Sequence, residues 1–111
     1  MQRIPDEFDV ASTVITWYVN KTKTIKAQVD SDYSECEVGR RVALRKVRPG
    51  RTPRTLAVLS TNAMARVKLK NTYGAGRYFA AAKFKTFTDE FGKTGRCLWA
   101  KSVNVVRVAK K

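Results

Sequence analysis

The residues whose chemistry stands out are Cys36 and Cys97, two thiols in a chain that contains no histidine. Two cysteines can form a disulfide, or they can act as small buried apolar side chains. Alone they do not supply the four ligands of a structural zinc site. Cys36 opens one segment that contains a strand-like stretch, and Cys97 opens the last such segment. A bridge between them would staple two β layers and close a loop of about 60 residues, which stabilises by roughly 4 kcal/mol in the chain-entropy account.

The chain lacks the groups that common classes of enzyme use. There is no histidine to act as a general base, and no Gly-x-Ser-x-Gly sequence marks a nucleophile. A cluster of acids lacks the glycine and the distal glutamate of an EF-hand, so it is expected to cap turns and pair with arginines; its members are Asp30, Asp32, Glu35 and Glu37. We therefore expect no enzyme activity, no catalytic residue, no metal, no cofactor and no small-molecule substrate.

The charge balance is strongly basic. Lysine and arginine number 23 against 9 acids, a formal net charge of +14. A charge of this size informs about partners and solubility and not about fold. One run of cations without an acid lies between residues 40 and 54, and two smaller clusters lie at 21–26 and 66–70; the cations are Arg40, Arg41, Arg45, Lys46, Arg48, Arg51, Arg54, Lys21, Lys23, Lys26, Arg66, Lys68 and Lys70.

Two interpretations of these basic clusters are open. A cationic sheet face can bind nucleic acid if aromatic side chains stack on the bases, the candidates being Trp17, Tyr18, Tyr73, Phe79 and Trp99. The same face can remain solvated or dock on an acidic protein surface. No ribonucleoprotein motif, helix-turn-helix or zinc finger occurs, which favours protein over nucleic acid as the partner. We expect Trp17 and Trp99 in the core, because large aromatic side chains anchor sandwich interiors.

Length and composition indicate one globular domain. The chain has 111 residues, of which 43% are hydrophobic and 29% charged. No apolar run is long enough to cross a membrane, and residues 1–8 lack the features of a secretory signal. Either a signal was removed, or the protein reaches the outside by another route, such as the release of virus particles by lysis.

Short segments that alternate or are rich in β-branched residues predict strands at 12–19, 24–29, 41–46, 55–59, 65–70, 77–85 and 97–108. Loops are expected at 48–53, 71–76 and 88–95. Turn signals every 8–12 residues or so indicate an all-β sandwich or barrel. We predict a single antiparallel β-sandwich of about seven strands over residues 10–109, preceded by an N-terminal arm (1–9) and followed by a basic tail (110–111).

The alternation also assigns faces. The segment 65–70 is the cleanest case: its apolar residues point inward and its cations outward, the latter being Arg66, Lys68 and Lys70. Val47 breaks the alternation of its own segment, so a bulge or a strand end is expected near Lys46.

The order of these motifs resembles a known family. Cys-x-x-x-Arg-x-Val-x-Leu is followed by a Pro-Gly loop, a threonine-rich strand, Gly-Arg-Tyr-aromatic-Ala and Cys-x-x-Ala-x-Ser-x-x-Val. This order looks like bacterial extracellular immunoglobulin-like domains, which are similar to carboxypeptidase-regulatory-like, or prealbumin-like, β-sandwich modules. The match covers roughly residues 13–108 through loose, mostly structural motifs, and it comprises Cys36, Arg40 or Arg41, Val42, Leu44, Pro49, Gly50, Gly76, Arg77, Tyr78, Phe79, Ala80, Cys97, Ala100, Ser102 and Val105.

The resemblance implies that the predicted sandwich is an immunoglobulin-like β-sandwich, a module without activity of its own that serves as a surface, adhesive or spacer element. Together with the strand positions, it favours a disulfide between Cys36 and Cys97. The chain departs from the pattern at 59–66, which lacks the Asp-Gly turn often seen before the next strand, and in having no flanking modules. A freestanding domain of this kind resembles the small decoration proteins that tailed bacteriophages place on their capsids.

We therefore expect a non-enzymatic virion-surface or extracellular protein that docks through a basic face onto an acidic protein surface, such as a capsid lattice. The expected contacts are Arg45, Arg48, Arg51, Arg54, Arg66, Lys68 and Lys70. Two alternatives stay open: a single-stranded nucleic-acid-binding protein with an OB-like β-barrel, and a secreted bacterial surface or adhesion domain. Self-association as a homo-oligomer through edge strands is also open.

Overall fold

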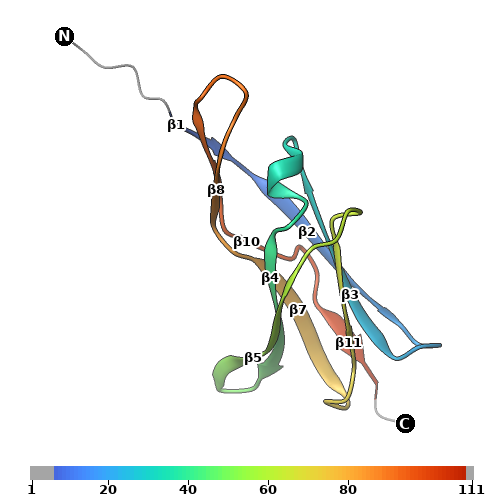
Figure 1. Ribbon diagram of the computed structural model, residues 1–111. Helices are drawn as coiled ribbons and strands as arrows, with labels where there is room; N and C mark the ends of the chain where they lie inside the picture. Colours follow the sequence, from blue (N-terminus) through green and yellow to red (C-terminus); the bar gives the residue numbers. More distant parts are fainter. Residues whose placement is uncertain (1–6, 110–111) are drawn as a thin grey trace.

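The computed structural model describes residues 7–109 and consists of short strands joined by turns (Figure 1). The strands are β1 (Glu7–Val10), β2 (Ser12–Val19), β3 (Thr24–Ser31), β4 (Arg41–Arg48), β5 (Arg51–Ser60), β6 (Arg66–Lys70), β7 (Gly76–Ala82), β8 (Lys85–Thr88), β9 (Thr94–Cys97), β10 (Ala100–Lys101) and β11 (Val106–Val108). A 3₁₀ turn, η1 (Ser34–Cys36), is the only helical element in this part of the chain. The all-β class predicted from the sequence is confirmed.

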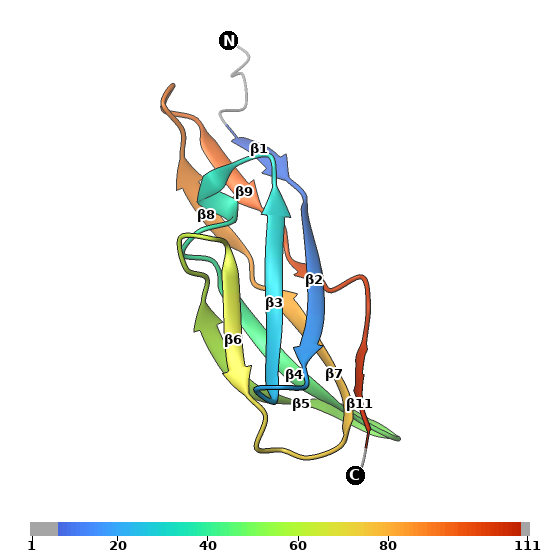
Figure 2. The ribbon, with the colours of Figure 1, turned by 90° about the vertical axis from the view of Figure 1, so that its right-hand side faces the viewer.

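The strands form three sheets. One has the order β2-β3-β6, and a second has the order β10-β7-β4-β5 with β11 also paired to β7. These two pack face to face as a sandwich (Figure 2). The third sheet, β1-β9-β8, extends beyond one end of the sandwich, and its β1–β9 pair is parallel.

The extra sheet explains the elongated shape. The molecule measures 65 × 32 × 18 Å, and its radius of gyration is 16.1 Å. A compact domain of this length has a radius of gyration of about 13 Å. The long axis therefore separates two ends, one formed by the β1-β9-β8 sheet and the other by the β2–β3 and β4–β5 turns.

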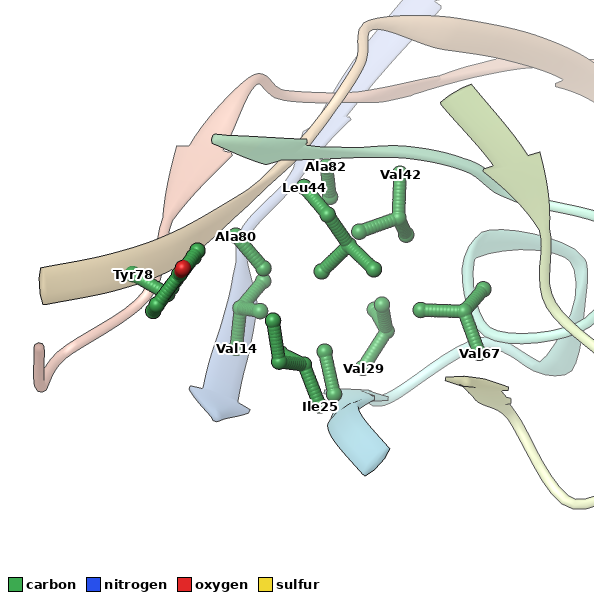
Figure 3. Close-up of a cluster of buried hydrophobic side chains, with 10 residues drawn as sticks. Val14, Ile25, Val29, Val42, Leu44, Val67, Tyr78, Ala80 and Ala82 are labelled. Atoms are coloured by element: carbon green, nitrogen blue, oxygen red, sulfur yellow. The ribbon is translucent and has the colours of Figure 1, made fainter. Parts of the chain in front are cut away.

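The core lies between the two sheets of the sandwich (Figure 3). Alternate residues of each strand point into it because successive side chains of a strand face opposite ways. The buried set is Val14, Ile25, Ala27, Val29, Val42, Leu44, Val67, Tyr78, Ala80 and Ala82. The alternation expected at 65–70 is confirmed, since Val67 faces this core while Lys68 and Lys70 are exposed.

The predicted disulfide is present, but it lies outside this core. Cys36 in η1 and Cys97 in β9 are bonded, with their Cα atoms 5.5 Å apart. They pack in a second cluster with Val10, Phe8 and Phe87. The bridge therefore ties the turn after β3 to the small sheet, and does not staple the two layers of the sandwich as the sequence suggested.

Several predicted boundaries were wrong. The loop expected at 48–53 is a tight turn at Pro49-Gly50, with Arg48 paired to Arg51. Gly50 has φ +69°, and proline followed by a positive-φ glycine is the pattern of a type II turn. Pro53 lies within β5, which tolerates it because β5 is an edge strand. One local expectation agrees with the structure: the β4–β5 ladder shifts register on both sides of Lys46, near which a bulge or a strand end was predicted.

Two other segments differ from the prediction. The loop expected at 88–95 includes part of a hairpin formed by β8 and β9. The single strand expected at 97–108 is divided among the end of β9, β10 and β11. Within the segment 1–9 that was expected to be an arm, residues 7–9 lie in β1 and pair with β9, where Phe8 packs against the disulfide cluster. Residues 1–6 and the tail 110–111 lie outside the described residues.

Residues 7–109 contain no helix of the length and apolar character needed to cross a membrane.

Candidate functional site

Charge is divided along the long axis of the molecule. Every described acid lies in β1, in the segment from Asp30 to Glu37, or in the β8–β9 loop at Asp89 and Glu90. These segments gather at the end that carries the small sheet (Figure 1). No acid occurs between Glu37 and Asp89, so β4, β5, β6 and β7 carry only cations. The opposite end is therefore uniformly basic. We call it the basic end, and we include in it the β4–β5 hairpin and the outer face of the β2-β3-β6 sheet.

The first part of the basic end is the β4–β5 hairpin. Its register places Arg48 opposite Arg51 and Lys46 opposite Arg54. Arg51 and Arg54 are exposed, whereas Arg48 donates from Nε to the carbonyl oxygen of Thr52 at 2.8 Å. In each of these two pairs, two like charges lie opposite each other across the hairpin.

Arg45 is one of the expected contacts that are only partly accessible. It is half-buried, and its Nη2 donates to the carbonyl oxygen of Pro53 at 3.0 Å. Its guanidinium lies 5.9 Å from the centre of the Phe79 ring, which Lys101 covers at 4.6 Å. Phe79 is only 3% exposed. Arg45 therefore covers an aromatic side chain of its own sheet, and Arg51 and Arg54 are better placed to meet a partner.

The second part is the outer face of the β2-β3-β6 sheet. Arg66, Lys68 and Lys70 alternate along β6 on this face, and Lys68 is opposite Lys26 of β3. Trp17 of β2 lies on the same face beside Lys26. The Arg66 guanidinium is 5.7 Å from the centre of the Trp17 ring, and its Nε donates to Gln28 Oε1 at 3.1 Å.

Tyr73 joins the two parts. It lies in the loop that follows β6, and its carbonyl oxygen accepts a hydrogen bond from Lys46 Nζ at 2.8 Å. The Arg54 guanidinium lies 5.8 Å from the centre of the Tyr73 ring. The expected contacts thus occupy two different layers of the sandwich, linked at this tyrosine.

Like-charge pairing recurs through the basic end. Besides the two pairs of the hairpin and the Lys26–Lys68 pair, Arg77 of β7 is opposite Arg107 of β11. Like charges directly opposite on neighbouring strands are destabilising. The only ion pairs among residues 7–109 join Arg96 to Glu7 and Asp9, at the other end. The fold therefore holds four like-charge pairs and supplies no counter-charge of its own.

Arg40 was counted with the basic run, but it is not part of this surface. It is fully buried and donates to the carbonyl oxygens of Cys36, Lys83 and Leu98 and to Ser12 Oγ. Burial lowers the pKa of its guanidinium below the usual value for arginine. Apart from Cys36, these acceptors lie 28 to 58 residues away in the sequence, so no local signal identifies this role.

The aromatic residues are distributed differently from the prediction. Trp99 is 55% exposed and Trp17 is half-buried on an outer face, so neither belongs to the core. Both follow from strand geometry: Trp17 alternates with the inward Thr16 and Tyr18, and Trp99 precedes β10, where the ladder is interrupted. Tyr18 and Tyr73 pack against the core. Trp17 is thus the one stacking candidate that lies on the outer face with Lys26, Arg66 and Lys68.

A groove that no sequence motif announced lies beside β6. It has a volume of about 400 Å³ and separates the end of β5 from β6. Apolar atoms come from Leu59, Met64 and Val67, and cations from Lys26, Arg66 and Lys68. The groove is therefore lined by both apolar and cationic side chains.

The acidic cluster behaves partly as expected. Glu37 Oε2 accepts a hydrogen bond from the Ser31 backbone N–H at 3.0 Å, which caps the turn after β3. The ion pairs expected between this cluster and arginines are not formed within residues 7–109. Nor do three potential metal ligands from histidine, cysteine, aspartate and glutamate come together in that range.

No model of a known protein family matches the chain, and the search of curated proteins finds no match either.

Proposed function

We propose that this protein is a non-enzymatic binding module that docks through its basic end onto an acidic macromolecular surface. The observation that carries the proposal is the set of four like-charge cross-strand pairs, to which residues 7–109 supply no acidic partner. Each such pair costs free energy in the isolated protein, on the order of a few tenths of a kcal/mol. An anionic partner would neutralise this repulsion, so relief of the repulsion would contribute favourably to the free energy of binding.

We propose an acidic protein surface as the partner, concretely the outer shell of a virus particle. This assignment rests on the resemblance to immunoglobulin-like domains, and the strand order of the sandwich supports that resemblance. In chain order, its first, second and fifth strands (β2, β3, β6) form one sheet, and the others form the second. Immunoglobulin-like sandwiches group their strands in a similar way, differing in the sheet to which the fourth strand belongs.

The disulfide supports a location outside the reducing cytoplasm. A virion surface and an extracellular surface both satisfy this condition. On either, an elongated module with one basic end can attach by that end and leave the small sheet pointing outward.

A second candidate, single-stranded nucleic acid, is favoured by one observation. Trp17 lies on the same face as Lys26, Arg66 and Lys68, the combination of stacking platform and cations that single strands need. The Trp17 ring is, however, already covered on one side by Arg66. Aromatic side chains in a row, which nucleic-acid platforms use, do not accompany it on this sheet face.

The test compares two double variants that remove the same charge. Arg51→Ser/Arg54→Ser removes two exposed cations of the hairpin, and Lys83→Ser/Lys93→Ser removes two exposed cations nearer the acidic end. Binding to immobilised poly-L-glutamate and to a dT20 oligonucleotide is measured as a function of salt. The proposal expects the hairpin variant to lose about tenfold more affinity for polyglutamate than the control, a difference of about 1.4 kcal/mol. Equal losses would show that net charge alone is responsible and would overturn the docking assignment.

Trp17→Leu separates the two candidate partners. For an acidic protein surface, the variant keeps the affinity of the wild-type protein for polyglutamate. Nucleic acid is the partner if two results are found together. The wild-type protein would bind dT20 more tightly than polyglutamate, and Trp17→Leu would weaken the binding of dT20 by roughly 1–3 kcal/mol, as is typical of base stacking.

A further inference from the structure

The two lateral edges of the β2-β3-β6 sheet are finished differently. On one side β2 is covered by the segment between β10 and β11, which Figure 2 shows running beside it. Asn104 closes this edge by accepting from the Thr16 backbone N–H at 3.0 Å and donating to the Thr16 carbonyl oxygen at 2.6 Å. The Val103 N–H donates to the carbonyl oxygen of Val14 at 2.9 Å. The backbone groups of Thr16 and the carbonyl oxygen of Val14 are therefore satisfied as if another strand were paired to this part of β2.

On the other side β6 has a free edge. The Val29 N–H donates to the carbonyl oxygen of Ala65, so the backbone groups of Ala65, Val67 and Leu69 point toward β3 by the alternation of antiparallel pairing. The backbone groups of Arg66 and Lys68 point the other way. Asn62 takes up those of Arg66, through its own N–H and its side-chain oxygen.

Lys68 is left at the open position. Among residues 7–109, no hydrogen bond outside the β3–β6 ladder takes up its N–H or its carbonyl oxygen. The groove of about 400 Å³ lies directly beside it, with Leu59, Met64 and Val67 on its surface. Met64 is 64% exposed there. An unpaired backbone edge and an exposed apolar surface thus occur at one place.

We infer that this edge binds an extended acidic segment of the partner as an added strand paired to β6. The inference rests on the proposed function, because it specifies how the acidic partner is held. Strand addition supplies main-chain hydrogen bonds to a free edge, and the side chains of alternate residues provide the selectivity. The partner strand would pair with the free N–H and carbonyl oxygen of Lys68 and cover the groove.

The side chains of β6 specify the sequence pattern of that partner. Arg66, Lys68 and Lys70 project from one face, and Val67 and Leu69 face the core side. Opposite residues on paired strands interact directly, and opposite charges there are stabilising. The bound strand therefore alternates acidic with apolar residues. The same cations disfavour pairing with β6 of a second copy, since charged residues on an edge strand prevent self-association.

Two peptides of equal composition test the alternation. One has the sequence (Glu-Val)5 and the other has five glutamates followed by five valines, so their net charges are the same. Strand addition expects the wild-type protein to bind the alternating peptide about tenfold more tightly, or about 1.4 kcal/mol. It also expects the Lys68 amide to gain protection from hydrogen exchange when that peptide is added. Equal binding of both peptides, without this protection, would overturn strand addition.

Two substitutions at one position test the backbone contact. Lys68→Gln removes the charge and keeps the N–H, whereas Lys68→Pro removes both, at a position whose N–H does not serve the β3–β6 ladder. Strand addition expects Lys68→Pro to bind the alternating peptide about tenfold more weakly than Lys68→Gln. Circular dichroism and denaturant unfolding establish that both variants are folded, and the hydrogen-exchange measurement on the wild-type protein needs no variant.

The outcomes distinguish the two proposals. If the peptides bind equally, and polyglutamate binding still depends on Arg51 and Arg54, docking by the basic end stands and strand addition fails. If the wild-type protein binds neither peptide nor polyglutamate, the proposed function fails with it. Tighter binding of dT20 than of both peptides assigns the surface to nucleic acid and rejects the inference.

Discussion

The guanidinium of Arg40 donates a hydrogen bond from Nη2 to the carbonyl oxygen of Leu98 at 2.7 Å, at a point where two strands have stopped pairing. Lys85 is paired with Cys97 and Ala82 with Ala100, so two residues on each side between these pairs have no ladder partner. Arg40 Nε donates to Lys83 on the facing side at 2.6 Å. One side chain thus bridges the break and connects the sandwich to the small sheet.

Arg40→Met should lower the free energy of unfolding by on the order of 3 kcal/mol, because it leaves several buried carbonyl oxygens without donors. Arg41→Met, at an exposed neighbouring position, is the matched control and should stay within about 0.5 kcal/mol of the wild type. Urea unfolding under non-reducing conditions measures both. Equal stability of the two variants would contradict the bridging role.

Replacing both cysteines, as Cys36→Ala/Cys97→Ala, should destabilise the protein by roughly 4 kcal/mol, since the bond spans 61 residues. The loss should be uneven. Amides of β1 and β9 are expected to exchange faster, while those of β3, in the sandwich core, keep more of their protection. Hydrogen exchange resolved by residue makes the comparison, and uniform loss along the chain would place the disulfide's influence in the main core instead.

Gly95→Ala should destabilise by about 1–3 kcal/mol through overpacking. Phe87 is paired opposite Gly95, and its ring occupies the space that a Cβ atom would need. The ring also contacts Phe8 and Tyr33, with centroid distances of 5.9 and 5.5 Å. In a Phe87→Ala background, the same glycine substitution should be nearly neutral. A double-mutant cycle measures this coupling, and additive effects of the two changes would refute the contact.

Tyr78 should ionise at a higher pH than an ordinary tyrosine. Burial raises its pKa above the ordinary value of 10.0, opposed by the hydrogen bond to Asn71 and reinforced by the nearby Tyr18. Because the folded-state pKa is the higher one, the stabilising contribution is complete below pH 10 and is lost as the pH rises through the folded pKa. Spectrophotometric titration follows ionisation, and Tyr78→Phe should remove the ionisation that occurs above the ordinary tyrosine pKa. A titration curve unchanged by that substitution would disprove the assignment.

Lys26→Glu should change stability and binding in opposite directions. It replaces the Lys26–Lys68 pair by opposite charges, which should stabilise the free protein by about 0.2–1 kcal/mol. The same change should weaken binding to polyglutamate. Lys26→Gln, which removes the repulsion without adding attraction, should lie between the two in both measurements. A Lys26→Glu protein that is less stable than the wild type would argue against repulsion between these strands.

Local patterns predicted the parts of the fold that local physics determines. The segment 65–70 could be assigned to a strand with the correct face inward, because Val67 alternates with cations that remain in solvent. The irregularity near Lys46 was also predicted from a local pattern, as a bulge or a strand end, because Val47 interrupts the alternation of apolar and polar residues. The all-β class follows from several such segments in succession.

Long-range contacts determined the parts that the sequence could not predict. The break in the segment 97–108 is bridged by Arg40, which lies 58 residues before Leu98. Arg40 therefore had the same appearance in the sequence as the exposed cations beside it. The like-charge pairs required the register of the sheets, which bulges and turns fix. The groove beside β6 required the relative position of β5 in the other sheet.

The amide of Asn104 closes one edge of the β2-β3-β6 sheet at Thr16, and this has a consequence for stoichiometry. If β6 accepts a strand as proposed, the β2 edge of the same sheet cannot pass the interaction on at Thr16, whose backbone groups already bond to Asn104. Addition to this sheet would then end at β6, so occupancy of a repetitive acidic lattice should saturate at one copy per acceptor segment.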